Sequence, residues 1–137
     1  MPTFRFSVSG NPGKFTYYPD EDWTYTHQDT VRFETPSGQF ELDLIQEDVP
    51  PSVSHAPFPR LPLRSQSGKD DKGNPVFYAE TGVEDGLTQQ QRQDAMEGHA
   101  TAADPEGFIA RYRYKISVEM PGKPPAFDDQ KNGEYRC

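Results

Sequence analysis

Apolar and polar residues alternate with a period of two in several short segments near the two ends of the chain. In TFRFSVS, residues 3–9, Phe4, Phe6 and Val8 fall on one face and polar side chains on the other. This alternation is typical of a β-strand that buries one face. The other segments that we predict as strands are residues 14–18, 22–27, 75–80, 108–120 and 134–136.

The clearest alternation is in residues 108–120, FIARYRYKISVEM. One face of this predicted strand carries Tyr112, Tyr114, Ile116, Val118 and Met120. The opposite face carries Arg111, Arg113, Lys115, Ser117 and Glu119. The pattern predicts a strand whose aromatic and aliphatic face is buried and whose charged face is exposed to solvent.

Residues 27–44, HQDTVRFETPSGQFELDL, have the pattern of a β-hairpin or of two neighbouring strands. Val31 and Phe33 point to one side, and the alternation resumes after TPSG with Phe40, Leu42 and Leu44. Proline followed by glycine is typical of a tight turn.

The middle of the chain, residues 46–107, differs from the ends because it contains many prolines and polar turns such as SGKDDKGN. We expect a long insertion here, since such a composition favours extended connections. Within it, LTQQQRQDAMEGH has Thr88 and Gln91 at the spacing of a capping box and Gly98 where a helix would end. The sequence therefore predicts one short helix in this insertion.

Several strands joined by turns and one long connection predict an all-β fold, an antiparallel β-sandwich. QDTVRFETPSGQFELDL and ARYRYKISVEMPGK resemble two strand motifs of the cupredoxin family, although immunoglobulin-like sandwiches show similar alternation. The resemblance implies a cupredoxin-like sandwich. It does not imply copper, because Phe40 or a neighbour stands where the first ligand histidine is expected, no histidine follows His99, and the only cysteine is Cys137.

Length and charge limit the functions that the chain can have. Its 137 residues fit one domain, residues 1–137. Its formal net charge is -8, and nucleic-acid binding requires clustered cations, so no nucleic-acid partner is expected. No apolar run is long enough to span a membrane, so no membrane partner is expected. No signal peptide is visible, which makes a cytoplasmic location the default while the true location stays unknown.

The residues that carry chemistry match no known catalytic or metal-binding motif. We therefore predict no catalytic residue, no metal ligand, no cofactor and no enzyme activity. Two alternatives stay open: a metal-binding or electron-transfer protein that uses His27, His55 and His99, and a small enzyme with a site built from the insertion.

Two features suggest instead that the chain binds another protein. Arg111, Arg113 and Lys115 form a cationic row that either pairs with Glu34, Glu41 or Asp43 or binds an acidic partner segment. The Pro-rich stretch 49–64 carries Phe58, Leu61 and Leu63, which either cover one end of the sandwich or enter a groove of a partner. The sequence predicts a noncatalytic protein-interaction or assembly module with these six residues as its binding site.

Overall fold

In the computed structural model, the part of the chain that the structure describes comprises residues 2–10, 13–26, 29–49, 56–84 and 109–136. These residues form strands and contain no helix. The strands are β1 (Thr3–Ser9), β2 (Lys14–Tyr18), β3 (Trp23–Thr26), β4 (Thr30–Thr35), β5 (Phe40–Asp48), β6 (Leu63–Arg64), β7 (Gln66–Lys69), β8 (Pro75–Gly82), β9 (Ile109–Val118) and β10 (Ala126–Arg136).

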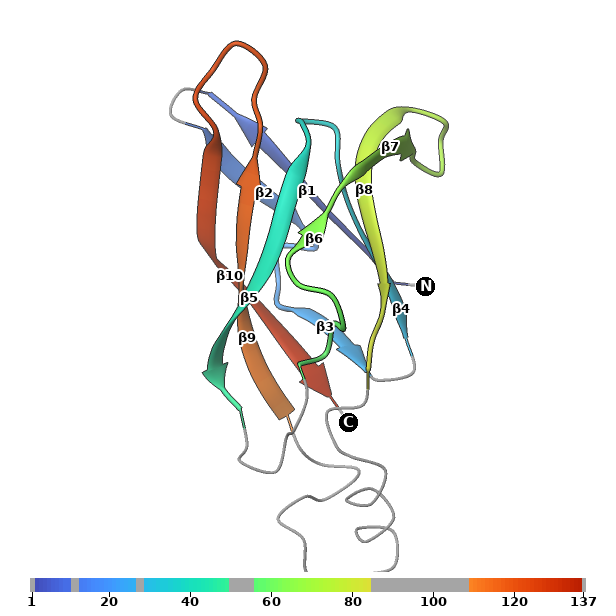
Figure 1. The fold of residues 1–137 in the computed structure, drawn as a ribbon, viewed down its shortest axis with the longest axis vertical. Coiled ribbons are helices and arrows are strands. Elements are labelled where there is room, and N and C mark those ends of the chain that lie inside the picture. Colours follow the sequence, from blue (N-terminus) through green and yellow to red (C-terminus); the bar gives the residue numbers. More distant parts are fainter. Residues whose placement is uncertain (1, 11–12, 27–28, 50–55, 85–108, 137) are drawn as a thin grey trace, which may run out of the picture.

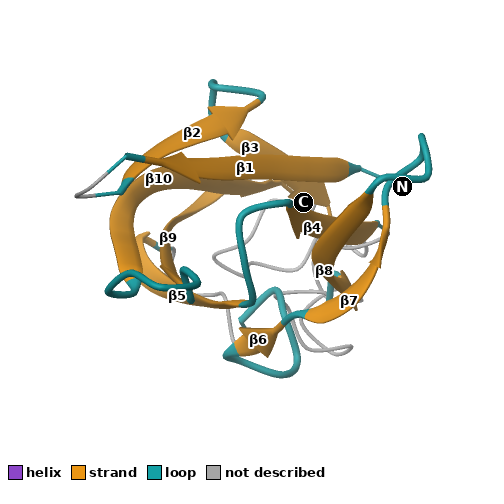
Figure 2. Ribbon diagram, turned by 90° about the horizontal axis from the view of Figure 1, so that it is seen from above, coloured by secondary structure: helices purple, strands orange, loops and turns teal. Residues whose placement is uncertain are grey.

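The strands form two five-stranded sheets that pack face to face (Figures 1 and 2). The first sheet has the order β2-β1-β4-β8-β7 and the second the order β3-β10-β9-β5-β6. This arrangement confirms the prediction of an all-β sandwich. The sequence predicted an antiparallel sandwich, and most neighbouring strands are antiparallel, but β1 pairs with β4 and β3 pairs with β10 in parallel. Side-chain alternation is the same in parallel and antiparallel strands, so it does not report strand direction.

The two strands predicted between residues 27 and 44 are present, but they do not form a hairpin. β4 belongs to the first sheet and β5 to the second, and the turn between them carries the chain across the sandwich. Gly38 lies in this turn, where a Cβ atom would overlap the carbonyl oxygen of Glu119. The close approach attaches the turn to the end of β9, since Glu119 N–H donates to Gln39 O at 2.7 Å.

The central segment contains more strands than the sequence predicted. Within residues 46–107 lie β6, β7 and β8, whereas the sequence predicted a single short strand there. β6 joins the second sheet and β7 and β8 join the first, so this segment supplies strands to both sheets. The helix predicted in residues 87–99 falls within 85–108, which lie outside the described residues.

β10 is also longer than the predicted strand of residues 134–136. It runs antiparallel to β9, with an irregularity in the register between Asp128 and Lys131. Gly133 faces the ring of Tyr114 so closely that a Cβ atom at this position would overlap the ring. The buried positions of β10 include a lysine, Lys131, and a glycine, Gly133, so apolar alternation is weak in the sequence of this strand.

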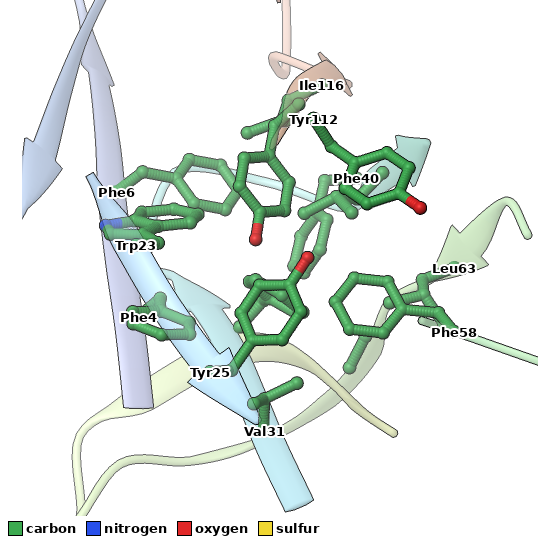
Figure 3. Close-up of a cluster of buried hydrophobic side chains, with 14 of the residues drawn as sticks. Phe4, Phe6, Trp23, Tyr25, Val31, Phe40, Phe58, Leu63, Tyr112 and Ile116 are labelled. Atoms are coloured by element: carbon green, nitrogen blue, oxygen red, sulfur yellow. The ribbon is translucent and has the colours of Figure 1, made fainter. Parts of the chain in front are cut away.

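Aromatic side chains dominate the core between the sheets (Figure 3). The ring of Trp23 is fully buried and stacks on Phe4 with a centroid distance of 4.9 Å. It also contacts Tyr114 edge-on at 5.1 Å. Trp23 and Tyr114 come from the second sheet and Phe4 from the first, so these contacts join the two sheets directly.

Candidate functional site

The predicted cationic row lies on the outer face of the second sheet. Arg111, Arg113 and Lys115 alternate along β9 with the buried Tyr112 and Tyr114, as the sequence predicted. Arg111 and Lys115 are exposed, and Arg113 is half-buried. β9 is flanked by β10 on one side and by β5 on the other, so the row lies in the interior of the sheet.

The carboxylates that pair with this row differ from those we predicted. Arg113 forms an ion pair with Glu47, and Arg111 Nε lies 3.6 Å from a carboxylate oxygen of Glu134. The predicted partner Glu34 lies on β4, in the other sheet, and cannot reach β9. The two remaining predicted partners also bind elsewhere: Glu41 pairs with Arg64 at 3.1 Å, and Asp43 Oδ1 accepts the N–H of Leu44 at 2.8 Å.

Lys115 is the member of the row without a carboxylate partner among the described residues. Its Nζ lies 6.0 Å from the centre of the Phe127 ring, within the range of a cation–π contact. Phe127 is 52% exposed, and Tyr18 on the first sheet is the other large apolar side chain of the described residues with comparable exposure. Lys115 and Phe127 thus place a cation and an aromatic ring together on an open sheet face.

A depression of about 420 Å³ lies further along β9, where Ser117 and not Lys115 or Phe127 is one of its lining residues. Its walls include Glu41 of β5, Arg64 of β6, Ser117 of β9 and Pro125. Phe127 lies directly opposite Ser117, one of the lining residues, in the register of β9 and β10. We call the surface formed by Arg111, Lys115, Phe127 and this depression the β9 face; no sequence pattern singled out Phe127, because it is one apolar residue in a polar segment.

The apolar residues of the predicted second docking element lie in or against the core. Phe58 is buried and its ring centre is 5.2 Å from that of Tyr25. Leu63 is buried and pairs with Leu42 of β5, while Leu61 is partly buried against the core. These side chains fill one end of the sandwich, so they do not present an apolar surface to solvent.

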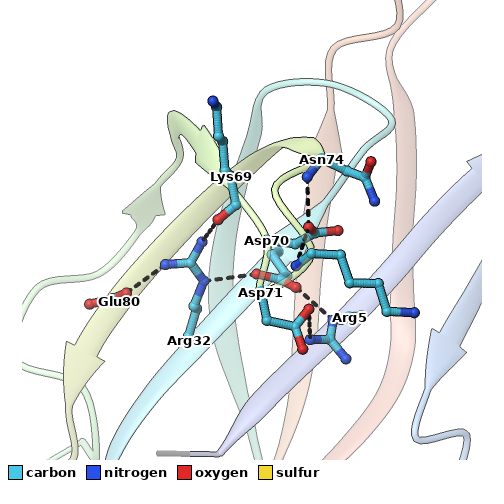
Figure 4. Close-up of polar contacts among 9 residues, drawn as sticks. Arg5, Arg32, Lys69, Asp70, Asp71, Asn74 and Glu80 are labelled. Carbon is cyan, nitrogen blue, oxygen red and sulfur yellow. Dashed lines mark hydrogen bonds and ion pairs between the residues drawn. The ribbon is translucent and has the colours of Figure 1, made fainter.

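A second charged cluster lies on the outer face of the first sheet (Figure 4). Glu34 is only 3% exposed and accepts hydrogen bonds from Arg5 Nε at 2.6 Å and Arg32 Nε at 2.8 Å. The hydrogen bond to Glu34 raises the pKa of Arg5. Arg32 also donates to Glu80 at 2.7 Å and to the carbonyl oxygen of Lys69 at 2.8 Å. Since these charges bind one another, the cluster stabilises the sheet.

A buried lysine closes the side of the sandwich between β2 and β10. Lys131 Nζ donates to the carbonyl oxygens of Pro19 at 3.1 Å and Glu21 at 2.6 Å. It also lies 5.1 Å from the ring of Tyr17 and 5.3 Å from that of Trp23. Burial lowers the pKa of Lys131, because the charged form loses its hydration. These contacts attach the turn after β2 to β10.

Metal binding finds no support in the described ranges, where no three His, Cys, Asp or Glu residues gather closely enough to hold an ion. His27, His55, His99 and Cys137 lie outside the described residues, so a site that uses them stays a hypothesis. The described residues also include no helix that is long and apolar enough to cross a membrane.

Comparison with known proteins gives no relative: no family model, no curated protein and no solved structure matches this chain. Function is therefore inferred from the chemistry of its own surface.

Proposed function

We propose that this chain is a noncatalytic protein-interaction module that binds a partner protein through the β9 face. The observation that supports this function is the exposed ring of Phe127, which lies beneath a cation that has no carboxylate partner among the described residues. Ser117, opposite Phe127, lines the depression. Aromatic side chains, phenylalanine included, are enriched at protein–protein interfaces relative to the rest of the surface. Three of the residues that the sequence singled out, Arg111, Arg113 and Lys115, lie on the same sheet face.

Each part of the β9 face has a role in this binding. Burial of the exposed half of the Phe127 ring stabilises a complex by about 1 to 2 kcal/mol, and the depression accepts a side chain of the partner. Lys115 and Arg111 attract carboxylates, whereas Arg113 is held by Glu47 and keeps the strand in place. The cations increase the rate of association and the specificity of binding more than they increase affinity.

Partner capture by matched variants tests this function. The immobilised full-length protein, its Phe127→Ala variant and its Tyr18→Ala variant are each incubated with extract from the source cells. Tyr18 is a suitable control because it is 66% exposed but lies on the first sheet. We expect a stoichiometric partner that wild type and Tyr18→Ala retain and that Phe127→Ala loses, with unchanged circular dichroism. Equal capture by all three proteins would contradict the role of the β9 face.

We also propose that the sandwich is cupredoxin-like and has no copper centre of the blue type. The support is the strand with buried Tyr112 and Tyr114, which resembles the strand that precedes the copper loop in that family, and the absence of Cys and His after it in residues 115–136. A crystal structure whose strand order is compared with that of cupredoxins tests the fold. Copper added to the protein should give no intense blue absorption; such an absorption would overturn the second part.

A further inference from the structure

Lys115 is exposed and has no ion pair among the described residues, although a carboxylate lies opposite it on β5. Asp43 lies opposite Lys115 in the register of β5 and β9, where an ion pair across the strands would be expected. Instead, Asp43 Oδ1 accepts the backbone N–H of Leu44 at 2.8 Å. No ion pair to Lys115 exists among the described residues, where its ammonium group contacts the ring of Phe127.

Arg111 is the second accessible cation of this face. Its side chain is 58% exposed, and its contact with Glu134 is long at 3.6 Å. Arg113 lies between the two cations but is already paired with Glu47. Lys115 and Arg111 are four residues apart on one strand and point to the same side, which separates them by about 13 Å.

These positions define the chemistry of a complementary segment. An extended chain has the same rise per residue as β9, so carboxylates four residues apart in the partner match Lys115 and Arg111. Ser117 lies two residues beyond Lys115 on β9, and it lines the depression. Phe127 lies opposite Ser117 on β10. An apolar side chain two residues from the first carboxylate would therefore contact Phe127.

Resting on the proposed function, we propose that the β9 face recognises an extended acidic protein segment with two carboxylates four residues apart. In the partner segment, an apolar residue lies two positions from the carboxylate that binds Lys115. It is on the opposite side of this carboxylate from the one that binds Arg111. Lys115 and Phe127 form the central recognition pair, and Arg111 binds the distant carboxylate. Asp43 weakens this recognition, because its charge repels a carboxylate that approaches Lys115.

A synthetic peptide tests this specificity without knowledge of the natural partner. Acetyl-LTETTTE-amide has the required spacing, and acetyl-LTTEETT-amide has the same composition with its acids adjacent. Each is titrated into the isotope-labelled full-length protein while amide chemical shifts are followed. We expect the first peptide to bind at least about fivefold more tightly, with shifts at Arg111, Lys115 and Phe127, and salt to weaken it. Equal binding of both peptides, or shifts confined to other surfaces, overturns the proposal.

Two substitutions give effects of opposite sign. Lys115→Gln should weaken binding of the first peptide about threefold, as expected for the loss of one solvent-exposed charge pair. Asp43→Asn should strengthen binding severalfold, because it removes the repelling charge while its Oδ1 still accepts the N–H of Leu44. Unchanged or weaker binding by Asp43→Asn contradicts the proposal, since a purely structural Asp43 gives no gain.

The peptide experiment tests the acidic specificity, and the capture experiment tests the proposed function, so each proposal can be contradicted without the other. If Phe127→Ala loses a partner but the two peptides bind alike, the β9 face is an interface and its acidic specificity is wrong. If the peptides discriminate but capture does not depend on Phe127, the recognition chemistry holds for peptides and the proposed function is wrong. If neither depends on the β9 face, both proposals are wrong.

Discussion

Glu34 illustrates how one side chain can depart from the pattern of its strand. It occupies an outward position on β4, where the sequence indicates an exposed charge, but it is buried at 3% exposure. The cause is the convergence of Arg5 from β1 and Arg32 from β4 on its two carboxylate oxygens. The strand pattern gives the face of each residue, and it does not show that three charges from two strands will meet.

Replacement of Glu34 by glutamine should lower the free energy of unfolding by about 2 to 3 kcal/mol. The amide is neutral, and its NH2 group cannot accept a hydrogen bond, so Arg5 and Arg32 lose the buried carboxylate that they share. Arg32 keeps Glu80, and Arg5 keeps only the longer contact with Asp71. The value is below that of a fully buried pair, because Arg5 is 40% exposed and solvent screens it. Urea denaturation measures the change.

The matched control for Glu34 is Glu80→Gln. Glu80 binds the same Arg32, but it is 38% exposed and accepts one hydrogen bond from it. Its substitution should cost less than about 1 kcal/mol. Equal losses for the two variants would show that burial of the carboxylate does not determine the strength of this cluster.

At the scale of elements, period-two alternation identified most strands but could not assign them to sheets. Phe33 of β4 and Phe40 of β5 are both buried in the shared core, although their strands belong to different sheets. A hairpin and a crossing between sheets bury the same residues, so hydrophobicity alone does not distinguish them. The β9 face was predicted in part, because its cations alternate with buried tyrosines.

Two elements, and most of a third, had too little pattern to be predicted. β6 has two residues and β7 is the polar segment QSGK, so neither shows an apolar alternation. β10 has Lys131 and Gly133 at buried positions and an irregular register, which break the period of two. Phe127 belongs to this concealed strand, so its place beside Lys115 required the structure.

The turn between β4 and β5 depends on a glycine for steric reasons. Gly38→Ala should lower the free energy of unfolding by about 2 kcal/mol or more, since the new methyl group would overlap the carbonyl oxygen of Glu119 and move backbone rather than a flexible side chain. Gly82→Ala is the control, because no heavy atom lies within 4 Å of the position that its new methyl group would take and its φ is not positive. Thermal or urea unfolding compares the two.

Gly82→Ala should leave stability unchanged or raise it by up to about 1 kcal/mol, through lower entropy of the unfolded chain. A Gly38→Ala variant as stable as Gly82→Ala would mean that the turn can move away from β9. The crossing between the sheets would then not require close contact at this position.

At the scale of the whole molecule, packing two sheets around aromatic residues places several tyrosines in the interior. Burial raises the pKa of Tyr25, Tyr112 and Tyr114, because the phenolate form would lose its hydration. Burial also raises the pKa of Tyr17, and its hydrogen bond to Asp128 raises the value further. The folded protein therefore holds four phenolic protons more strongly than the unfolded chain does.

These tyrosines predict a loss of stability in alkali. In the unfolded chain a tyrosine ionises near pH 10, so below that pH both states keep the protons and these groups cause no change. Above it, the unfolded chain releases protons that the folded protein retains, and each tyrosine lowers the free energy of unfolding by about 1.4 kcal/mol per pH unit. Lys131 has the opposite effect on the free energy of unfolding at pH values between its lowered pKa and about 10.5. It is a single group, so the four tyrosines determine the sign of the total change.

Urea denaturation at a series of pH values should therefore show a steep decrease in stability above about pH 10, with phenolate absorbance of the four buried or half-buried tyrosines that appears together with unfolding. Tyr17→Phe should reduce the slope by about 1.4 kcal/mol per pH unit, because the difference in bound protons falls by one. If phenolate absorbance of the buried tyrosines appears while the protein keeps its near-ultraviolet circular dichroism, solvent reaches the core without unfolding. The tyrosines would then be accessible in the folded state, and the two sheets would not form a closed core.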